Sequence, residues 1–314
     1  VSGGRAGWNM VTGSSDLSAQ NFGYAKLPDH DLRYDMADEY IEIVTRLWDS
    51  WDPGAIVADR ESGILIDPAK VHPIDYVGEY YRCRGPLNSG PCPQGRPVIA
   101  QAGGSDRGKR FAATHADTIV AHVKGVEHMK AYRDDVHEKM TAAGRDPSTC
   151  KVLFLVAPIL GDSREEAQMK AEARRQRAAK NVDVKLAQMG WSTNIDFSVF
   201  DLDQPVGELT TNGHQQSLAQ FLRKAGKRTL REAITDYGTT GMSVDLIGTP
   251  DSVAAQMGEV MQEVGGDGYL VALGNVSRKS VAEITDGLVP ALQQRGLTRS
   301  AYEHRHLRDN LLEF

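Results

Sequence analysis

Short apolar runs alternate with amphipathic stretches along this chain, and that alternation limits the folds open to it. Five runs have the composition of strands, and each is bounded by Gly, Asp or Pro: residues 8–11, 97–101, 118–121, 152–158 and 268–273. Strands that are apolar at successive positions are typically buried on both faces. Strands that alternate with helical patterns build βα units around a parallel sheet. The sequence therefore predicts an α/β protein.

Helical patterns with recognisable starts lie between these runs. Asp31 is expected to cap a helix that reaches Trp48. Ser163 and Glu166 are expected to form a capping box that opens one long charged helix over residues 163–189. Thr249 followed by Pro250 places a cap before a proline at the first helical position. Pro290 is expected to end or kink the last helix.

Two stretches interrupt the alternation, residues 50–96 and residues 190–243. The first is rich in Asp-Pro and Gly-Pro turns, and the second is polar with one helical patch around Phe221. Insertions of this kind on a barrel usually lie at the active-site end and shape the substrate pocket. We expect one domain over residues 1–314, with these two stretches as excursions from it.

Composition excludes several classes of function. A net charge of −6 disfavours nucleic acid and anionic membranes as partners. No apolar run approaches the ~20 residues of a membrane span, and the first residues lack the apolar core of a signal peptide. We therefore expect a soluble cytoplasmic protein. The three scattered cysteines and nine histidines show no ligand spacing, so we expect no metal.

The segment QAGGSDRGKRF, residues 101–111, has glycine and lysine at the spacing of a phosphate-binding P-loop. A P-loop needs Ser or Thr after the lysine to hold magnesium, and Arg110 stands there instead. A strand that runs into Gly-Gly-Ser at a helix start still offers free N–H groups and a positive dipole end to a single phosphate or another anion. Ser105 is then either a helix N-cap or a hydroxyl donor to phosphate, and both remain open.

The number of strands bears on the architecture. A closed (β/α)8 barrel has eight parallel strands, whereas five are recognisable here. An open doubly wound sheet could manage with five, but its first glycine-rich turn would carry Gly-x-Gly-x-x-Gly, which SGGRAGWN does not match. The sequence therefore favours a TIM-like (β/α)8 barrel whose first strands are absent from the chain as given.

Several long motifs in fixed order resemble the nitrilotriacetate monooxygenase component A family of bacterial-luciferase-like flavin monooxygenases. They include SGGRAGWNMVTG, HDLRYDMADEYIEIVTRLWDSW, DPAKVHPIDYVGEYYRCRGPL and PVIAQAGGSDRGKRFAATHAD, and the resemblance covers nearly the whole chain. It implies a luciferase-type barrel with GRAGWN on the fourth strand, in agreement with the number of strands.

The resemblance also implies a function. Reduced FMN, supplied by a separate NAD(P)H-dependent flavin reductase, would react with O2 to a flavin hydroperoxide that oxidises a small organic substrate. Family substrates include aminopolycarboxylates such as nitrilotriacetate or EDTA, and sulfur heterocycles. Pairing of barrels in relatives implies a homodimer or homotetramer.

Matched motif by motif, the resemblance assigns six residues to the cofactor. They are Thr12 at the flavin, Tyr34 at the phosphate end, and Ala102, Gly103, Gly104 and Ser105 around the ring edge and phosphate. Ser14 and Gln188 are candidate substrate contacts, because an alkane-oxidising member carries histidines near these positions. No catalytic residue is assigned.

Three other functions remain open. One is hydride transfer by a deazaflavin or FMN without oxygen chemistry, and another is flavin binding without catalysis. A P-loop phosphotransferase is the third, which Arg110 disfavours. The substrate is not named by the sequence. Arg82 and Arg84 would suit a carboxylated substrate, although arginines on an excursion are commonly surface charges.

Overall fold

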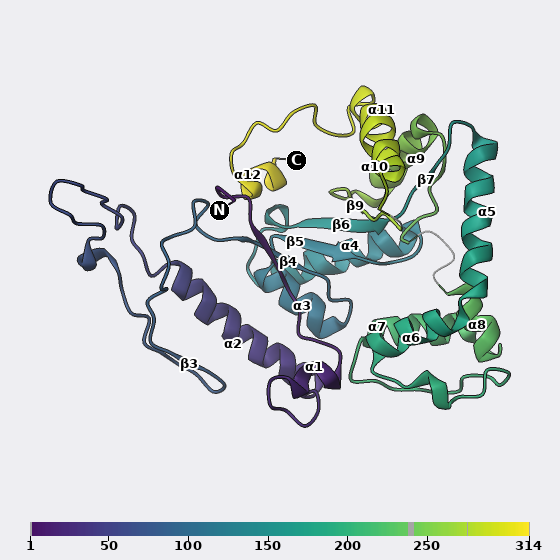
Figure 1. Ribbon diagram of the computed structural model, residues 1–314, viewed down its shortest axis with the longest axis horizontal. Coiled ribbons are helices and arrows are strands. Elements are labelled where there is room, and N and C mark those ends of the chain that lie inside the picture. Colours follow the sequence, from purple (N-terminus) through teal and green to yellow (C-terminus); the bar gives the residue numbers. More distant parts are fainter. Residues whose placement is uncertain (1, 238–241, 275, 314) are drawn as a thin grey trace.

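A five-stranded parallel sheet lies at the centre of the computed structural model, which describes residues 2–237, 242–274 and 276–313 (Figure 1). Its strands, in spatial order, are β1 (Gly7–Met10), β4 (Val98–Gln101), β5 (Thr118–Ala121), β6 (Lys151–Val156) and β9 (Tyr269–Val271). All five predicted strands are confirmed, with ends that differ by one to a few residues. The chain is therefore an α/β protein built on βα units.

Helices cover the sheet on one side. The helices α2 (His30–Trp48), α3 (Asp106–His115), α4 (Val126–Ala142), α9 (Pro250–Val264) and α11 (Val289–Gln294) pack side by side in that order. Side chains at alternate strand positions point into this layer and are buried, whereas Val120 and Leu155 are only partly buried and Leu270 is 42% exposed. The expectation that both strand faces are buried therefore holds in part of the described chain: two adjacent residues are buried at the start of β4, β5 and β6, whereas no residue of β9 is buried.

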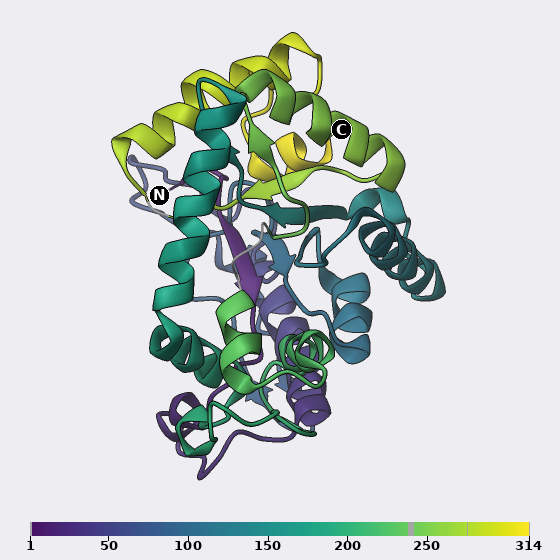
Figure 2. The ribbon, with the colours of Figure 1, turned by 90° about the vertical axis from the view of Figure 1, so that its right-hand side faces the viewer.

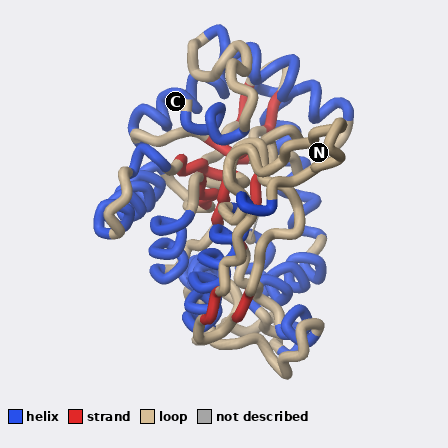
Figure 3. Tube along the Cα trace, turned by 90° about the vertical axis from the view of Figure 1, so that its left-hand side faces the viewer, coloured by secondary structure: helices blue, strands red, loops and turns tan. Residues whose placement is uncertain are grey.

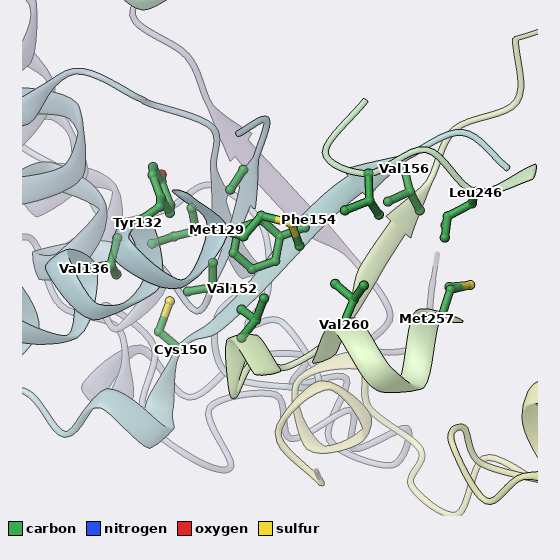
Figure 4. Close-up of a cluster of buried hydrophobic side chains, with 14 of the residues drawn as sticks. Met129, Tyr132, Val136, Cys150, Val152, Phe154, Val156, Leu246, Met257 and Val260 are labelled. Carbon is green, nitrogen blue, oxygen red and sulfur yellow. The ribbon is translucent and has the colours of Figure 1, made fainter. Parts of the chain in front are cut away.

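The main hydrophobic core lies between the sheet and these helices (Figure 4). Phe154 and Val152 of β6 are fully buried and pack with Met129 and Val136 of α4. Val260 of α9 closes the same core from the other side. Apolar strand residues need a layer of helices that shields them from water. Packing against that layer also holds the strand ends in place.

Helix starts agree in part with the sequence. Thr249 caps α9, because its hydroxyl accepts a hydrogen bond from the Ser252 N–H at 3.3 Å, and Pro250 follows as predicted. Asp31 does not cap α2: the N-cap is Asp29, and Asp31 lies within the first turn. A carboxylate in the first turn interacts favourably with the helix dipole, so Asp31 does mark the start of a helix. The cap itself lies two residues earlier, at Asp29.

The excursion over residues 50–96 is mostly loop, with the 3-10 turn η1 (Pro68–Lys70) and an antiparallel hairpin of β2 (Tyr76–Val77) and β3 (Arg82–Cys83) (Figure 3). Glu39 of α2 anchors the hairpin, since its carboxylate accepts hydrogen bonds from the N–H groups of Tyr80 at 2.9 Å and Tyr81 at 2.7 Å. The hairpin is thereby held against α2.

A second group of helices lies beyond the sheet, at the far end of α5 (Arg164–Lys180) (Figure 2). It contains α6 (Val182–Thr193), η3 (Phe197–Val199), α7 (Gln215–Ala225) and α8 (Leu230–Asp236) around its own buried cluster, which includes Phe197 and Phe221. The short parallel pair β7 (Ile159–Leu160) and β8 (Ile247–Gly248) links both ends of this group to the sheet.

Three predictions for this part of the chain are wrong. The single helix over residues 163–189 is interrupted at Asn181, whose φ of −109° and ψ of 51° are not helical. Ser163 accepts a hydrogen bond from the Glu166 N–H at 3.2 Å, but the Glu166 carboxylate accepts one from Asp162, so no closed capping box forms. The stretch after Gly190 also contains two helices rather than one patch, because burial of Phe197 and Phe221 in a shared cluster outweighs its polar composition.

Pro290 does not end the last helix. The chain runs through α10 (Arg278–Ala282), a π-helical segment (Glu283–Leu288) and α11 without a break, with Pro290 in the first turn of α11. The wider π turns accommodate a residue that has no N–H to donate. The remaining elements are α1 (Asp16–Gln20), η2 (Pro147–Thr149) and α12 (Leu307–Leu312).

Candidate functional site

The carboxyl ends of β1, β4 and β5 open into a cavity of about 360 Å³, which we call the cup. Ligands of parallel α/β proteins bind at this edge of the sheet. Five of the six residues that the resemblance assigns to the cofactor line the cup at consecutive strand ends: Thr12, Ala102, Gly103, Gly104 and Ser105. Tyr34, the sixth, lines it from α2. The structure thus brings all six together.

The turn from β4 into α3 is built by close packing. Ser105 is the N-cap of α3, and its hydroxyl accepts a hydrogen bond from the Gly108 N–H at 3.0 Å. A Cβ on Gly103 would lie 2.6 Å from Gln101 Nε2 and 3.0 Å from Gly108 Cα, so that position has no room for a side chain. The N-cap role of Ser105 is confirmed. It leaves the hydroxyl hydrogen free to donate, and the phosphate role remains open.

Two tyrosines hold this turn in place. Tyr34 is 5% exposed, and its hydroxyl would lie 2.7 Å from a Cβ on Gly108, while its ring packs on Phe111 at 5.5 Å between centroids. The Tyr132 hydroxyl donates to the Gly103 carbonyl at 3.0 Å. Burial raises the pKa of Tyr132, so its phenol stays protonated and remains a donor.

Two basic side chains that follow Ser105 in α3, those of Arg107 and Lys109, are paired with acids. Arg107 Nη2 lies 2.8 Å from Asp35 Oδ1, and 2.5 Å from Asp38 Oδ2. Lys109 forms an ion pair with Asp135. These partners lie on α2 and α4, so the two basic side chains tie helices together rather than adding free charge to the cup.

A segment far along the sequence covers the cup. Residues 211–217, which we call the strap, lead into α7 and contribute His214, Gln216 and Ser217 to the cup lining. Arg33, which is 6% exposed, donates from Nη2 to the Asn212 carbonyl at 2.9 Å and from Nη1 to Asn212 Oδ1 at 3.1 Å. The strap is therefore fastened to the start of α2.

The sequence analysis missed Arg33, His122, His214 and Gln216. His122 directly follows β5, a position where barrel strands carry functional side chains, so strand-end placement was a usable signal. Arg33 precedes Tyr34 within the same motif. No local sequence pattern predicts that the strap covers the cup, because its position depends on long-range contacts.

The two histidines in the cup share one electrostatic property. Partial desolvation in the cup lowers the pKa of His122, although the residue remains solvent-exposed, and the nearby cations Lys224 and Lys124 lower it further. Partial desolvation also lowers the pKa of His214, which is likewise exposed, assisted by the charge of Arg33. Both imidazoles thus favour the neutral form, in which one ring nitrogen can accept a proton.

A second cavity of about 640 Å³ adjoins the cup and shares with it Arg33 and the segment 10–13. We call it the apolar chamber, because aromatic and aliphatic side chains dominate its lining: Trp8, Phe22, Tyr24, Leu27, Met36, Tyr40, Tyr81 and Phe111. Among the described residues of this lining, only Arg33 is charged. Trp8 meets Tyr40 and Trp48 edge to face, each at 6.0 Å between centroids. The chamber has the size and lining of a site for a small apolar molecule.

The remaining candidate residues lie elsewhere. Ser14 is buried directly after Gly13, whose φ of 79° turns the chain, and it is not among the lining residues of either cavity. Gln188 lies on the exposed side of α6, outside both linings. Arg82 is exposed on β3, and Arg84 donates to the Gly85 carbonyl at 3.4 Å. The structure does not bring these four residues to the cup.

Among the described residues, no three His, Cys, Asp and Glu side chains are placed to hold a metal ion. None of their helices combines the length and apolar character that crossing a membrane requires.

Comparison with known proteins gives a consistent result. The family model for luciferase-like monooxygenases matches residues 1–268. Dibenzothiophene-sulfone monooxygenase of Rhodococcus erythropolis is 36% identical over 318 residues, which cover 99% of this chain and 70% of that protein. Nitrilotriacetate monooxygenase component A of Aminobacter aminovorans is 33% identical, over 99% of this chain and 69% of that protein.

Solved structures agree in fold. A riboflavin lyase with modified FMN and substrate riboflavin superposes with a TM-score of 0.87 at 32% identity, over 99% of this chain and 68% of that one. A long-chain alkane monooxygenase gives 0.83 at 33% identity, over 98% and 67%. These matches confirm the family resemblance and the luciferase-type TIM-barrel fold, whereas further strands before β1 stay a prediction. The chain belongs to the luciferase-like monooxygenase family, whose two-component members use reduced FMN.

Proposed function

We propose that this protein uses reduced FMN from a separate NAD(P)H-dependent flavin reductase, together with O2, to oxidise a small apolar substrate. The observation that carries the proposal is the junction of two cavities: a cup with anion-binding chemistry and an apolar chamber share the segment 10–13. A flavin in the cup would present its reactive ring to a substrate in the chamber. FMN, when bound, supplies the electrons that activate O2.

The residues of the cup fit FMN. The first turn of α3 offers backbone N–H groups and a positive dipole end to a phosphate, and Ser105 adds a hydroxyl. Gly103 and Gly104 line the cup with backbone alone, because neither carries a side chain. The Nε of Arg33 is buried and has no hydrogen-bond partner among the described residues. It could therefore donate a hydrogen bond to an anionic ligand in the cup. Thr12 and Tyr34 complete the proposed cofactor set with Ala102.

The chamber favours one of the two expected substrate classes. An aminopolycarboxylate carries several charges, and each buried carboxylate needs a cationic or hydrogen-bonding partner. In the part of the lining that the structure describes, Arg33 is the one charged residue, and it already donates to Asn212. A sulfur heterocycle needs only apolar area and a few polar contacts. We therefore place a sulfur heterocycle or another apolar ring system ahead of nitrilotriacetate-like compounds.

The protein's own residues then have three tasks. Ser105 and the α3 start bind the phosphate, the chamber excludes water and orients the substrate, and His122 and His214 hold or accept a proton beside the cup.

Hydride transfer with a deazaflavin is the second candidate function, and cofactor preference separates it from the first. One barrel domain over residues 1–314, a homodimer or homotetramer and a cytoplasmic location complete the proposal.

Turnover with paired substrates tests the proposal. The protein, an NADH-dependent FMN reductase and O2 are incubated with dibenzothiophene sulfone or with nitrilotriacetate, and products are followed by mass spectrometry. We expect oxidation of the heterocycle, with nitrilotriacetate left unchanged. Oxidation of nitrilotriacetate alone would reverse the substrate assignment. Loss of product when reduced deazaflavin replaces reduced FMN is also expected, whereas product only with the deazaflavin would favour hydride transfer.

A further inference from the structure

The Gln216 side chain occupies the space directly above Gly104. A Cβ built on Gly104 would lie 1.2 Å from Gln216 Oε1 and 2.1 Å from its Cδ. Gly104 has no positive φ that would require glycine, so the absent side chain serves to make room. The amide of Gln216 therefore rests on the floor of the cup, at the strand end where we place FMN.

The amide has unused hydrogen-bonding capacity. Among the described residues it makes no hydrogen bond to the protein, although it lies partly buried in the cup. A primary amide offers two N–H donors and one acceptor oxygen. Ser217 and Gln220, on the same side of α7, also line the cup. A polar edge of α7 thus faces the place of the cofactor with its donors and acceptors available.

The strap that carries Gln216 is fixed at several points. Besides the bonds from Arg33, Asn212 Nδ2 donates to the carbonyls of Leu27 at 3.1 Å and Pro28 at 2.9 Å. The His214 N–H donates to the Ser192 carbonyl at 2.9 Å. A Cβ on Gly213 would lie 2.7 Å from the Thr193 carbonyl carbon, so the strap also packs closely on the end of α6. These contacts hold the backbone of the strap and leave the end of the Gln216 side chain outside them.

We propose that Gln216 is a flavin-binding residue, which turns off Gly104 and hydrogen-bonds to FMN while the strap covers the bound cofactor. This inference rests on the proposed function, because it takes FMN as the occupant of the cup. The fixed strap holds the amide within reach, so the contact is formed without ordering a loop, which limits its entropic cost. Gln216 then controls mainly how slowly FMN leaves.

Flavin dissociation tests the inference. Reduced FMN is bound under anaerobic conditions, and its dissociation rate is measured by stopped-flow absorbance with displacement, for the unchanged protein and for Gln216→Ala and Gln216→Glu. We expect koff to rise about tenfold for Gln216→Ala, the effect of one lost hydrogen bond. Gln216→Glu should raise koff further, because a carboxylate of nearly the same shape repels the anionic phosphate. The matched control is Gln262→Ala, because Gln262 is an exposed glutamine on α9 outside both cavity linings and its substitution should leave koff unchanged.

Two more measurements separate binding from structure. Gly104→Ala places a methyl where the amide lies, so its effect on koff should be smaller in a Gln216→Ala background than in the unchanged protein. Hydrogen exchange of residues 211–217 should slow when FMN binds to the unchanged protein, and less so in Gln216→Ala. Dissociation rates within twofold of the unchanged protein for both Gln216 variants would overturn the inference and leave the proposed function intact. No FMN binding by the unchanged protein would overturn both.

Discussion

Arg33 and Asn212 lie 179 residues apart in the sequence and are joined by two hydrogen bonds, of 2.9 Å to the Asn212 carbonyl and 3.1 Å to its side-chain oxygen. Arg33 also donates to the Pro28 carbonyl at 2.5 Å. One guanidinium thus fastens the start of α2 to the strap. Because Arg33 lines both the cup and the apolar chamber, this clasp also shapes the proposed active site.

Removal of the clasp should destabilise the protein. Arg33→Met leaves the Asn212 carbonyl without the donor Arg33 and removes one of the two donors to the Pro28 carbonyl, which keeps Asn212 Nδ2. Each unsatisfied buried group costs about 1–3 kcal/mol, and the lost hydrogen bonds add to this cost. We expect the free energy of unfolding, measured in urea, to fall by about 2–4 kcal/mol. Arg110→Met is the control: the Arg110 side chain is 59% exposed, and its ion pair with Asp106 should contribute under about 0.5 kcal/mol. Equal stability of Arg33→Met and the unchanged protein would contradict the clasp.

The two roles of Ser105 can be separated by two substitutions. Ser105→Gly preserves most of the N-cap and costs a few tenths of a kcal/mol, whereas Ser105→Ala costs about 1 kcal/mol. Both remove the hydroxyl that would donate to phosphate. We expect FMN affinity, measured by flavin fluorescence, to fall about tenfold in both variants, with a clear loss of Tm only for Ser105→Ala. Unchanged FMN affinity in Ser105→Gly would leave Ser105 as a helix cap alone.

Tyr132 supports the cup from below. Tyr132→Phe removes the donor to the Gly103 carbonyl and should cost about 1 kcal/mol of stability. The glycine turn then loses a restraint, so FMN affinity should fall a few-fold. Tyr302→Phe is the control, because Tyr302 is 79% exposed and its ring contact with Arg299 survives the substitution. Equal Tm and FMN affinity for the two variants would show that the hydrogen bond does not support the cup.

Stability should depend on pH through the cup histidines. The folded state lowers the pKa of His122 and His214 from the usual value of 6.5, so the unfolded chain takes up protons first as pH falls. Above pH 6.5 both states are neutral at these residues, and they contribute no pH dependence. Below it, Tm should fall progressively. The His122→Gln, His214→Gln double variant should show a shallower fall between pH 6.5 and 4.5, with His137, whose pKa is also lowered, providing a remaining slope. A fall as steep as that of the unchanged protein would contradict this assignment.

Local sequence patterns predicted the strands and several helix starts. Apolar runs such as residues 118–121 become strands because burial of their side chains is favourable in any α/β arrangement. Thr249 and Pro250 start α9 because helix capping depends on neighbouring residues alone. The break at Asn181 was not predictable in this way. It depends on how α6 packs into the cluster around Phe197 and Phe221.

The candidate site likewise contains residues that local sequence motifs predicted and residues that only long-range contacts bring to the cup. Thr12, Tyr34 and residues 102–105 belong to contiguous motifs, and the structure brings them together in the cup. Gln188 was chosen by its position relative to a family member, yet its side chain lies on the exposed side of α6. Gln216 reaches Gly104 only because the strap is fastened by Arg33 and packed on α6, a set of long-range contacts that leaves no pattern in the local sequence.

Isotope incorporation tests the central claim most directly. The protein is loaded with reduced FMN under anaerobic conditions and mixed with buffer containing 18O2 and dibenzothiophene sulfone, and both labelled product and hydrogen peroxide are measured. The monooxygenase function predicts product carrying one atom of 18O and a hydrogen peroxide yield that falls when substrate is present. Recovery of all electrons as hydrogen peroxide, with no labelled product from either the heterocycle or nitrilotriacetate and with oxidised FMN bound as tightly as reduced FMN, would contradict it.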